Sequence, residues 1–280
     1  MKNAMQLKAY VKNIAKEKDI SAQLVLQNYM LERYLERVSL SEYRDKYIIK
    51  GGFLIASLVG LESRATMDLD ATIKGYPVNE DSIRSMVESI ISVPVDDGIS
   101  FQIKDIGLIR EDDEYGGIRV SLNANYEKMA VPLKLDITTG DKITPGEIEY
   151  SYKLMMEERS ISILSYNLST ILAEKLETVV SRGDQNTRPR DYYDIFILSK
   201  LQDKNIVIDT LRDALIATSE KRGSNEIMVN YEGIIRDVSV NEVMNQRWND
   251  YRKDFSYASE IEFKDACERV ITILDRIALS

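Results

Sequence analysis

The sequence contains no histidine among its 280 residues. Hydrolases with a Ser-His-Asp or Cys-His arrangement, zinc enzymes with histidine ligands and zinc deaminases all depend on an imidazole, so their usual designs are excluded. Any chemistry must therefore rely on carboxylates, lysine, hydroxyl groups and, where a metal takes part, a hard ion bound through oxygen.

Cysteine is almost as scarce, since Cys267 is the single one in the chain. One cysteine excludes an internal disulfide and a cysteine-rich zinc site. Cys267 lies in the patterned stretch DACERVITIL, so we expect a small buried apolar side chain rather than a nucleophile.

Long apolar runs are also lacking. None approaches the roughly 18 residues that span a bilayer, and the opening stretch MKNAMQLKAYVKN has no signal-peptide core. We therefore expect no membrane partner and a cytoplasmic location.

Positive charge is in deficit, because the formal net charge is -9. Such a protein is not expected to coat nucleic acids in general. Lys8, Lys12 and Lys16 nevertheless recur every fourth residue and share one helical face. The simpler interpretation is a helix face exposed to solvent, and the alternative is a face that binds along an RNA backbone.

The periodicity predicts an α+β first half and a helical second half, with domains at 1–160 and 161–280. Helices are expected over 4–46, directly after the glycine pair at 51–52, over 79–92 and from Leu168 onward. Strands are expected at LDATI, at ISFQIKDIGLI, GIRVSLNANY and VPLKLDIT, and near SISILSYN, with the acidic segment EDDEYGG as a hairpin loop. Ser239 with Glu242, and Ser259 with Glu262, fit capping boxes.

Two carboxylates of the strand-like run, Asp68 and Asp70, are candidates for metal binding. Residues two apart in a strand point to the same face, so both carboxylates project together while Leu69 packs inward. Two such carboxylates can hold one or two Mg²⁺ ions. So short a pattern also occurs by chance, and it gains weight only from other features of the chain.

The glycine pair Gly51-Gly52 is one such feature. Glycine lets the backbone approach a phosphate, and the N-terminus of the following helix offers unpaired N–H groups. A simple turn before a core helix is the alternative interpretation.

Asp136 is another candidate, in the strand-like VPLKLDIT. Its alternation directs Asp136 and Lys134 to one face and the neighbouring apolar residues to the core. Asp136 is therefore either a solvated charge or a third carboxylate beside the first two. Such a triad suits nucleotidyl transfer, in which metal ions stabilise the attacking and leaving oxygens and no histidine is needed.

The stretch IIKGGFLIASLVGLESRATMDLDATI resembles the opening motif of the DNA polymerase β-like nucleotidyltransferases, in which a glycine-containing turn leads through a helix to D-x-D. Within that superfamily it is similar to the AbiEii/AbiGii-type toxins, which place an arginine and a Ser or Thr ahead of the carboxylates. Phe53 stands where many members have Ser or Thr, which leaves phosphate contacts to backbone amides. The resemblance implies nucleotide binding by Lys50, Gly51, Gly52, Arg64 and Thr66, and catalysis and metal binding by Asp68, Asp70 and Asp136.

A later stretch, LSTILAEKLETVVSRGDQNTRPRDYYDIFIL, resembles the family's second block, a helix with A-E-K followed by R-x-R-D-x-x-D. By this resemblance Lys175 contacts the triphosphate, and one of Asp191 and Asp194 belongs to the active site. We assign catalysis to Asp194 and nucleotide binding to Asp191 and Arg190, with Arg182 and Arg188 near the nucleotide or acceptor. For Asp191, the simpler interpretation is an Arg–Asp network that holds two helices together. For Lys175, the simpler interpretation is a structural lysine.

The resemblance implies a polymerase β-like core, a mixed sheet with helices, followed by a C-terminal helical bundle. It further implies a toxin of a type IV toxin–antitoxin or abortive phage infection system that transfers NMP from an NTP to an acceptor. Mg²⁺ is the expected cofactor, with Mn²⁺ as an alternative, tRNA is the expected acceptor, and a cognate antitoxin is the expected protein partner.

Three other functions remain open at this level. An antibiotic-type enzyme would use the same core on a small molecule, a metal-dependent nuclease would use the same carboxylates, and a catalytically idle nucleotide-binding module would act through protein contacts. No P-loop motif is present.

Overall fold

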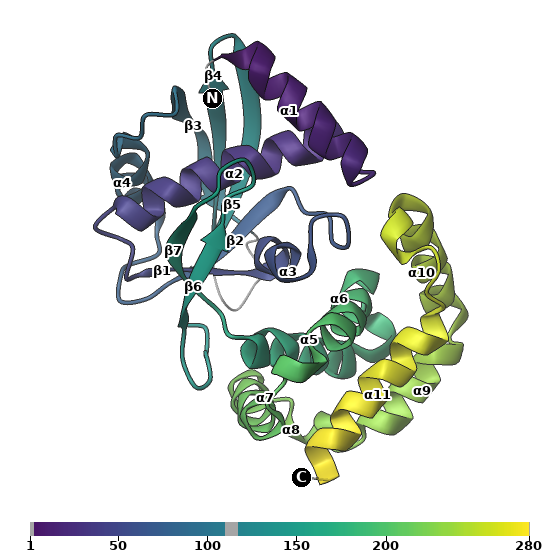
Figure 1. Cartoon of the computed structure of the whole chain (residues 1–280). Helices are drawn as coiled ribbons and strands as arrows, with labels where there is room; N and C mark the ends of the chain where they lie inside the picture. The colour runs from purple at the N-terminus through teal and green to yellow at the C-terminus, as the bar shows by residue number, and fades with distance from the viewer. Residues whose placement is uncertain (1–2, 110–116, 280) are drawn as a thin grey trace. The chain divides into compact units, whose positions relative to one another are not determined.

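The structure is a computed structural model, and it describes residues 3–109 and 117–279 (Figure 1). It consists of two compact units, one made of Met1–Asp141 with Ile148–Ser165 and the other of Lys142–Glu147 with Tyr166–Ser280. Within the described residues, no helix is long and apolar enough to cross a membrane.

The first unit is built on a seven-stranded mixed sheet with the order β3-β4-β5-β2-β1-β7-β6. Two neighbouring pairs, β2 with β5 and β1 with β7, are parallel, and the other four are antiparallel. The strands are β1 Tyr47–Lys50, β2 Asp68–Ile73, β3 Ile99–Leu108, β4 Ile118–Tyr126, β5 Met129–Thr139, β6 Ile148–Lys153 and β7 Ser160–Ser165. The mixed sheet with its helices confirms the predicted α+β class.

Five of these strands match the predicted runs, whereas β1 and β6 were not predicted. β1 has only four residues, too few to show alternation, and β6 lies at the edge of the sheet with Ile148 exposed. The pairing of Leu108 with Ile118 confirms a β3–β4 hairpin. Residues 111–116 of the predicted loop EDDEYGG lie outside the described residues.

Four helices accompany this sheet: α1 Ala4–Glu17, α2 Ala22–Leu40, α3 Gly51–Val59 and α4 Glu80–Ser92. α2 packs across β5 and β7, and α4 packs on β3 and α2 (Figure 1). Side-chain caps start α1, α2 and α4, and α3 has none. At α2, for example, the Ser21 hydroxyl accepts a hydrogen bond from the Leu24 N–H at 3.1 Å.

The α1 lysines Lys8, Lys12 and Lys16 are exposed. Leu7 and Val11 point the other way, into the contact with α2. Among the described residues, none of the three lysines has an ion-pair partner, so α1 carries an open basic face on an acidic protein.

Charged side chains are buried on α2. Glu32 is 0% exposed, accepts a hydrogen bond from the Met155 N–H at 2.5 Å and pairs with Arg33 at 2.7 Å. Arg33 also pairs with Glu36 and Glu157. Burial raises the pKa of Glu32 to about 7, against the opposing effect of Arg33. The network joins α2 to the turn between β6 and β7.

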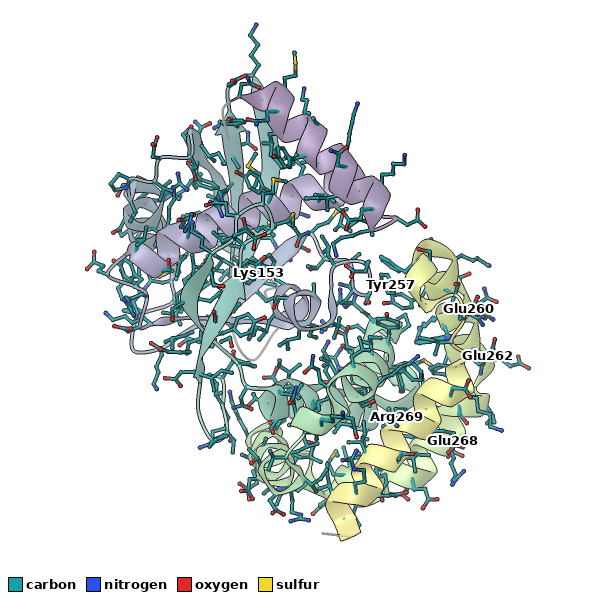
Figure 2. The ribbon with its side chains drawn as sticks, in the orientation of Figure 1. Lys153, Tyr257, Glu260, Glu262, Glu268 and Arg269 are labelled. Carbon is teal, nitrogen blue, oxygen red and sulfur yellow. The ribbon has the colours of Figure 1, made fainter. Side chains whose placement is uncertain are left out.

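The second unit is helical and contains α5 Leu168–Arg182, α6 Pro189–Leu201, α7 Ile208–Arg222, α8 Asn225–Met228, α9 Tyr231–Val240, α10 Glu242–Asp254 and α11 Phe263–Leu279. Segment 142–147 joins this unit because the Asn167 side chain donates to the carbonyls of Thr144 and Gly146 at 2.9 and 2.8 Å. Arg269 of α11, labelled in Figure 2, donates to Ser199 of α6 at 2.7 Å.

Neither predicted capping box forms. Asn241 caps α10 by accepting from the Met244 N–H, while the Ser239 hydroxyl donates back to a carbonyl of α9. Glu262 (Figure 2) pairs with Arg252 at 3.0 Å, and α11 begins after it. The capping pattern was present at both places, but a neighbouring asparagine and an arginine from another helix compete for these groups.

Cys267 is 1% exposed, and burial raises the pKa of its thiol to about 12. A thiol with so high a pKa is a poor nucleophile near neutral pH. The expected role as a small buried apolar side chain is confirmed.

Candidate active site

Four strands of the first unit bring charged residues to one level of the sheet. Strand register pairs Lys50 with Asp70, Asp70 with Asp136, and Asp136 with Arg119. Adjacent strands are about 4.8 Å apart, so the two carboxylates are direct neighbours. The sheet therefore gathers residues that lie far apart in the sequence.

The alternation along β2 and β5 matches the prediction. Asp68 is exposed and Asp70 half-buried, whereas Leu69 between them is fully buried. On β5, Asp136 lies between the buried Leu135 and Ile137. The three carboxylates consequently belong to the face of the sheet opposite the side chains that fill its core.

The glycine pair packs on Asp70. α3 begins at Gly51, whose φ of 64° lies in the left-handed region. A methyl group added there would lie 2.6 Å from Asp70 Cγ and closer still to Oδ2. The Gly52 N–H donates to Asp70 Oδ2 at 3.3 Å. Glycine is thus required at position 51 both for its conformation and for its contact with the carboxylate.

Arg64 and Thr66 lie beneath this turn and are 1% and 7% exposed. A methyl group added at Gly52 would lie 2.9 Å from Thr66 Oγ1 and 3.2 Å from Arg64 Nη2. Asn28 of α2 donates to the Thr66 carbonyl at 2.7 Å. The two side chains therefore pack against the glycine turn. Their nucleotide-binding role stays a prediction.

Phe53, the residue that departs from the family pattern, is 2% exposed and stacks on Tyr152 of β6 with ring centroids 5.6 Å apart. Its side chain points into the core. Position 53 therefore contributes to core packing and offers no hydroxyl group.

Two charged residues of this face were not predicted. Arg119 of β4 pairs with both oxygens of Asp136, through Nε at 2.8 Å and Nη2 at 2.7 Å. Asp141 accepts from Lys50 Nζ, which also donates to Thr138 Oγ1 at 2.8 Å. The alternation of β4 already directs Arg119 to the polar face, but its partner depends on strand register.

The donor chemistry of the three aspartates fits a hard divalent cation, because carboxylate oxygens are its preferred ligands. In the described part of the chain, however, no three such groups are drawn together as a metal cluster. Asp136 is turned to Arg119, and Asp70 accepts from the Gly52 N–H. The three residues fit the ion by the chemistry of their oxygens.

The second unit contains a charged cluster of its own. Lys175 of α5 pairs with Asp191 at 2.5 Å and with Asp194 at 3.0 Å, and both carboxylates are buried. Lys175 is 21% exposed at its side chain. The ion pairs pin α5 to α6, as in the simpler interpretation, although lysine and not arginine supplies the charge. The catalytic roles of the three residues stay predictions.

The arginines of the same block are placed differently. Arg182, Arg188 and Arg190 are all exposed, and among the described residues their side chains have no ion-pair partner. Asn186 in the turn between them is fully buried and accepts from the Arg188 N–H at 2.8 Å. The second unit therefore presents open guanidinium groups around the start of α6, which begins with Pro189.

Several solved structures align with this chain over most of its length. MenT4, a nucleotidyltransferase toxin from Mycobacterium tuberculosis H37Rv, matches with a TM-score of 0.53 and 13% identity over 96% of this chain and 98% of its own. JHP933 from Helicobacter pylori has a TM-score of 0.49 and 16% identity over 92% of each chain. An antigenic nucleotidyltransferase-like protein from Paracoccidioides brasiliensis has a TM-score of 0.39 and 15% identity over 71% of this chain and 90% of its own.

No curated protein sequence matches the chain. The family model of the nucleotidyl transferase AbiEii toxin of type IV toxin–antitoxin systems matches residues 33–269. This range includes the carboxylates of the first unit and the Lys175 cluster of the second. The chain therefore belongs to the AbiEii family of nucleotidyltransferase toxins.

Proposed function

We propose that this nucleotidyltransferase toxin transfers an NMP from an NTP to the 3′ end of an RNA, with tRNA as the acceptor, in a reaction that requires Mg²⁺ or Mn²⁺. The register of Asp70 beside Asp136, with Asp68 on the same face, carries the proposal. Because NTPs and tRNA are cytoplasmic, the proposed place of action is the cytoplasm.

Asp68, Asp70 and Asp136 would hold the divalent cation. When bound, Mg²⁺ stabilises the attacking and leaving oxygens of an in-line displacement at the α-phosphorus. The carboxylates would contribute by holding the ion at one place on the sheet, since positioning and electrostatics supply most of the catalysis in phosphoryl transfer. This agrees with a chain that has no histidine.

Gly51 and Gly52 would bind phosphate oxygens through their backbone amides. They form the N-terminus of α3, where unpaired N–H groups and the helix dipole favour negative charge. The 3.3 Å hydrogen bond from the Gly52 N–H to Asp70 is long, so a phosphate oxygen can replace it at small cost. Arg64 and Thr66 would hold this turn in shape.

For the second unit the proposal keeps the roles that the family resemblance implies. Lys175 would bind a phosphate group, Asp194 would be the catalytic carboxylate, and Arg190 and Asp191 would take part in nucleotide binding. The exposed arginines beside α6 support an anionic ligand, since a guanidinium pairs well with phosphate.

The basic face of α1 supports an extended anionic acceptor. Its lysines are separated by about 6 Å along the helix axis, so each can meet a different phosphate. A small antibiotic acceptor would not use such a surface. We therefore favour RNA, with recognition by shape and backbone charge rather than by base sequence.

The biological setting is part of the proposal. Membership in a type IV toxin family implies a partner antitoxin. We propose that the toxin blocks translation by modifying tRNA, and that it acts in abortive phage infection and phage defence.

The proposal is tested by incubating purified protein with total tRNA, Mg²⁺ and each α-labelled NTP in turn. Label on tRNA with one NTP, lost in Asp70→Ala, supports the reaction and identifies the donor. Shortened RNA without NTP would indicate a nuclease instead. Intact, unlabelled tRNA with all four NTPs would exclude tRNA and redirect the search to small-molecule acceptors.

A further inference from the structure

The ion pair between Arg119 and Asp136 uses the whole carboxylate. Nε donates to Oδ1 at 2.8 Å and Nη2 to Oδ2 at 2.7 Å. The side chain of Asp136 is 17% exposed and that of Arg119 is 42% exposed. The guanidinium thus contacts both oxygens of an acidic residue of the candidate site, while much of the Arg119 side chain stays exposed to solvent.

The pair is built into the sheet. Register makes Arg119 the direct cross-strand neighbour of Asp136, which in turn neighbours Asp70. Arg119 therefore lies in the combined field of the three carboxylates, where a divalent cation would also be most stable.

A cation at this place and a guanidinium on both Asp136 oxygens repel each other. The bidentate pair also holds the Asp136 carboxylate to a guanidinium of β4 through both of its oxygens.

We infer that Arg119 is a positioning residue that holds Asp136 while no metal is bound and competes with the divalent cation for that carboxylate. The inference rests on the proposed function, because it assigns Asp136 to the metal. The metal binds the form in which Asp136 has left Arg119, so its apparent affinity is reduced by the fraction of molecules in that form.

Lys134 provides a matched control. It lies on β5 on the same face, is exposed, and is the register neighbour of Asp68. Among the described residues it has no ion-pair partner. Lys134→Gln and Arg119→Gln therefore remove the same charge from the same surface, and only the second frees Asp136.

The test is a calorimetric titration of the purified full chain with Mn²⁺ alone, without NTP. Arg119→Gln should bind Mn²⁺ about tenfold more tightly than the unmodified chain, and Arg119→Lys should fall between them because lysine is a point charge that cannot form the paired contact. Lys134→Gln should stay within about twofold of the unmodified chain, and Asp136→Asn should lose the site. Circular dichroism checks that the variants are folded.

Unchanged or weaker Mn²⁺ binding by Arg119→Gln would overturn the competition, provided that Asp136→Asn still loses the site. An equal gain in Lys134→Gln would overturn it too, since net charge would then explain the effect. If Asp136→Asn binds Mn²⁺ like the unmodified chain, or if neither the chain nor Arg119→Gln binds it, the metal assignment in the proposed function fails and the inference fails with it.

Discussion

Gly51→Ala is the substitution whose effect the structure determines most directly. The new residue must keep a φ of 64°, which costs about 1–2 kcal/mol for a non-glycine residue. Its methyl group would also lie 2.6 Å from Asp70 Cγ, so the carboxylate must move. Asp70 then loses the hydrogen bond from the Gly52 N–H, which is long at 3.3 Å and worth about 1 kcal/mol. The expected loss of unfolding free energy is about 2–3 kcal/mol.

Gly75→Ala separates the two contributions. Gly75 has nearly the same φ, 65°, but nothing lies within 4 Å of an added methyl group. Gly75→Ala should therefore cost only the conformational part, about 1–2 kcal/mol. Gly107→Ala, with neither a positive φ nor a close neighbour, should be almost neutral.

The measurements are urea unfolding of the full chain followed by far-ultraviolet circular dichroism, and nucleotidyl transfer at saturating NTP. Gly51→Ala should lose at least about 100-fold in transfer rate because Asp70 is displaced, whereas Gly75→Ala should remain active. In an Asp70→Ala background the stability cost of Gly51→Ala should shrink, since two of the three crowded atoms are gone. Equal destabilisation by Gly51→Ala and Gly75→Ala, with full activity in both, would refute the reasoning.

Three further predictions concern other parts of the chain. Because burial raises the pKa of Glu32 to about 7, the folded state holds this proton more tightly than the unfolded chain, and the unfolding free energy should fall by on the order of 3 kcal/mol between about pH 4.5 and pH 7. Urea midpoints should decrease with pH over this range in the unmodified chain and not in Glu32→Gln. Midpoints that increase with pH would contradict the prediction. Lys175→Met removes the cation that pairs with two buried carboxylates and should cost about 3 kcal/mol, with partial recovery in Lys175→Arg. An unchanged melting temperature in Lys175→Met would exclude the structural role. Replacing all three α1 lysines, Lys8, Lys12 and Lys16, with glutamate should weaken tRNA binding and reduce its salt dependence. The same replacement at the exposed Lys104, Lys128 and Lys204 should weaken tRNA binding much less. Equal effects of the two triple variants would indicate that net charge alone governs binding.

Local patterns in the sequence were sufficient to predict most of the helices and strands and the faces on which several side chains lie. The two-residue period of strands put Asp68 and Asp70 on one face and buried Leu69 between them, and the structure confirms this. The helical period located α1, α2, α4 and the helices after Leu168. The absence of histidine restricted the chemistry through composition alone. Each of these follows from residue types and from neighbours along the chain.

Other features depended on the tertiary structure because they join residues that are distant in the sequence. Short strands such as β1 lack a pattern of their own and form only when β2 and β7 supply hydrogen-bond partners. Capping at Ser239 failed because a better-placed asparagine took the role. Strand register alone places Asp136 beside Asp70 and brings Arg119 within hydrogen-bond distance of the Asp136 oxygens. Alternation states which face a side chain occupies, but only the packed sheet determines which residue lies beside it.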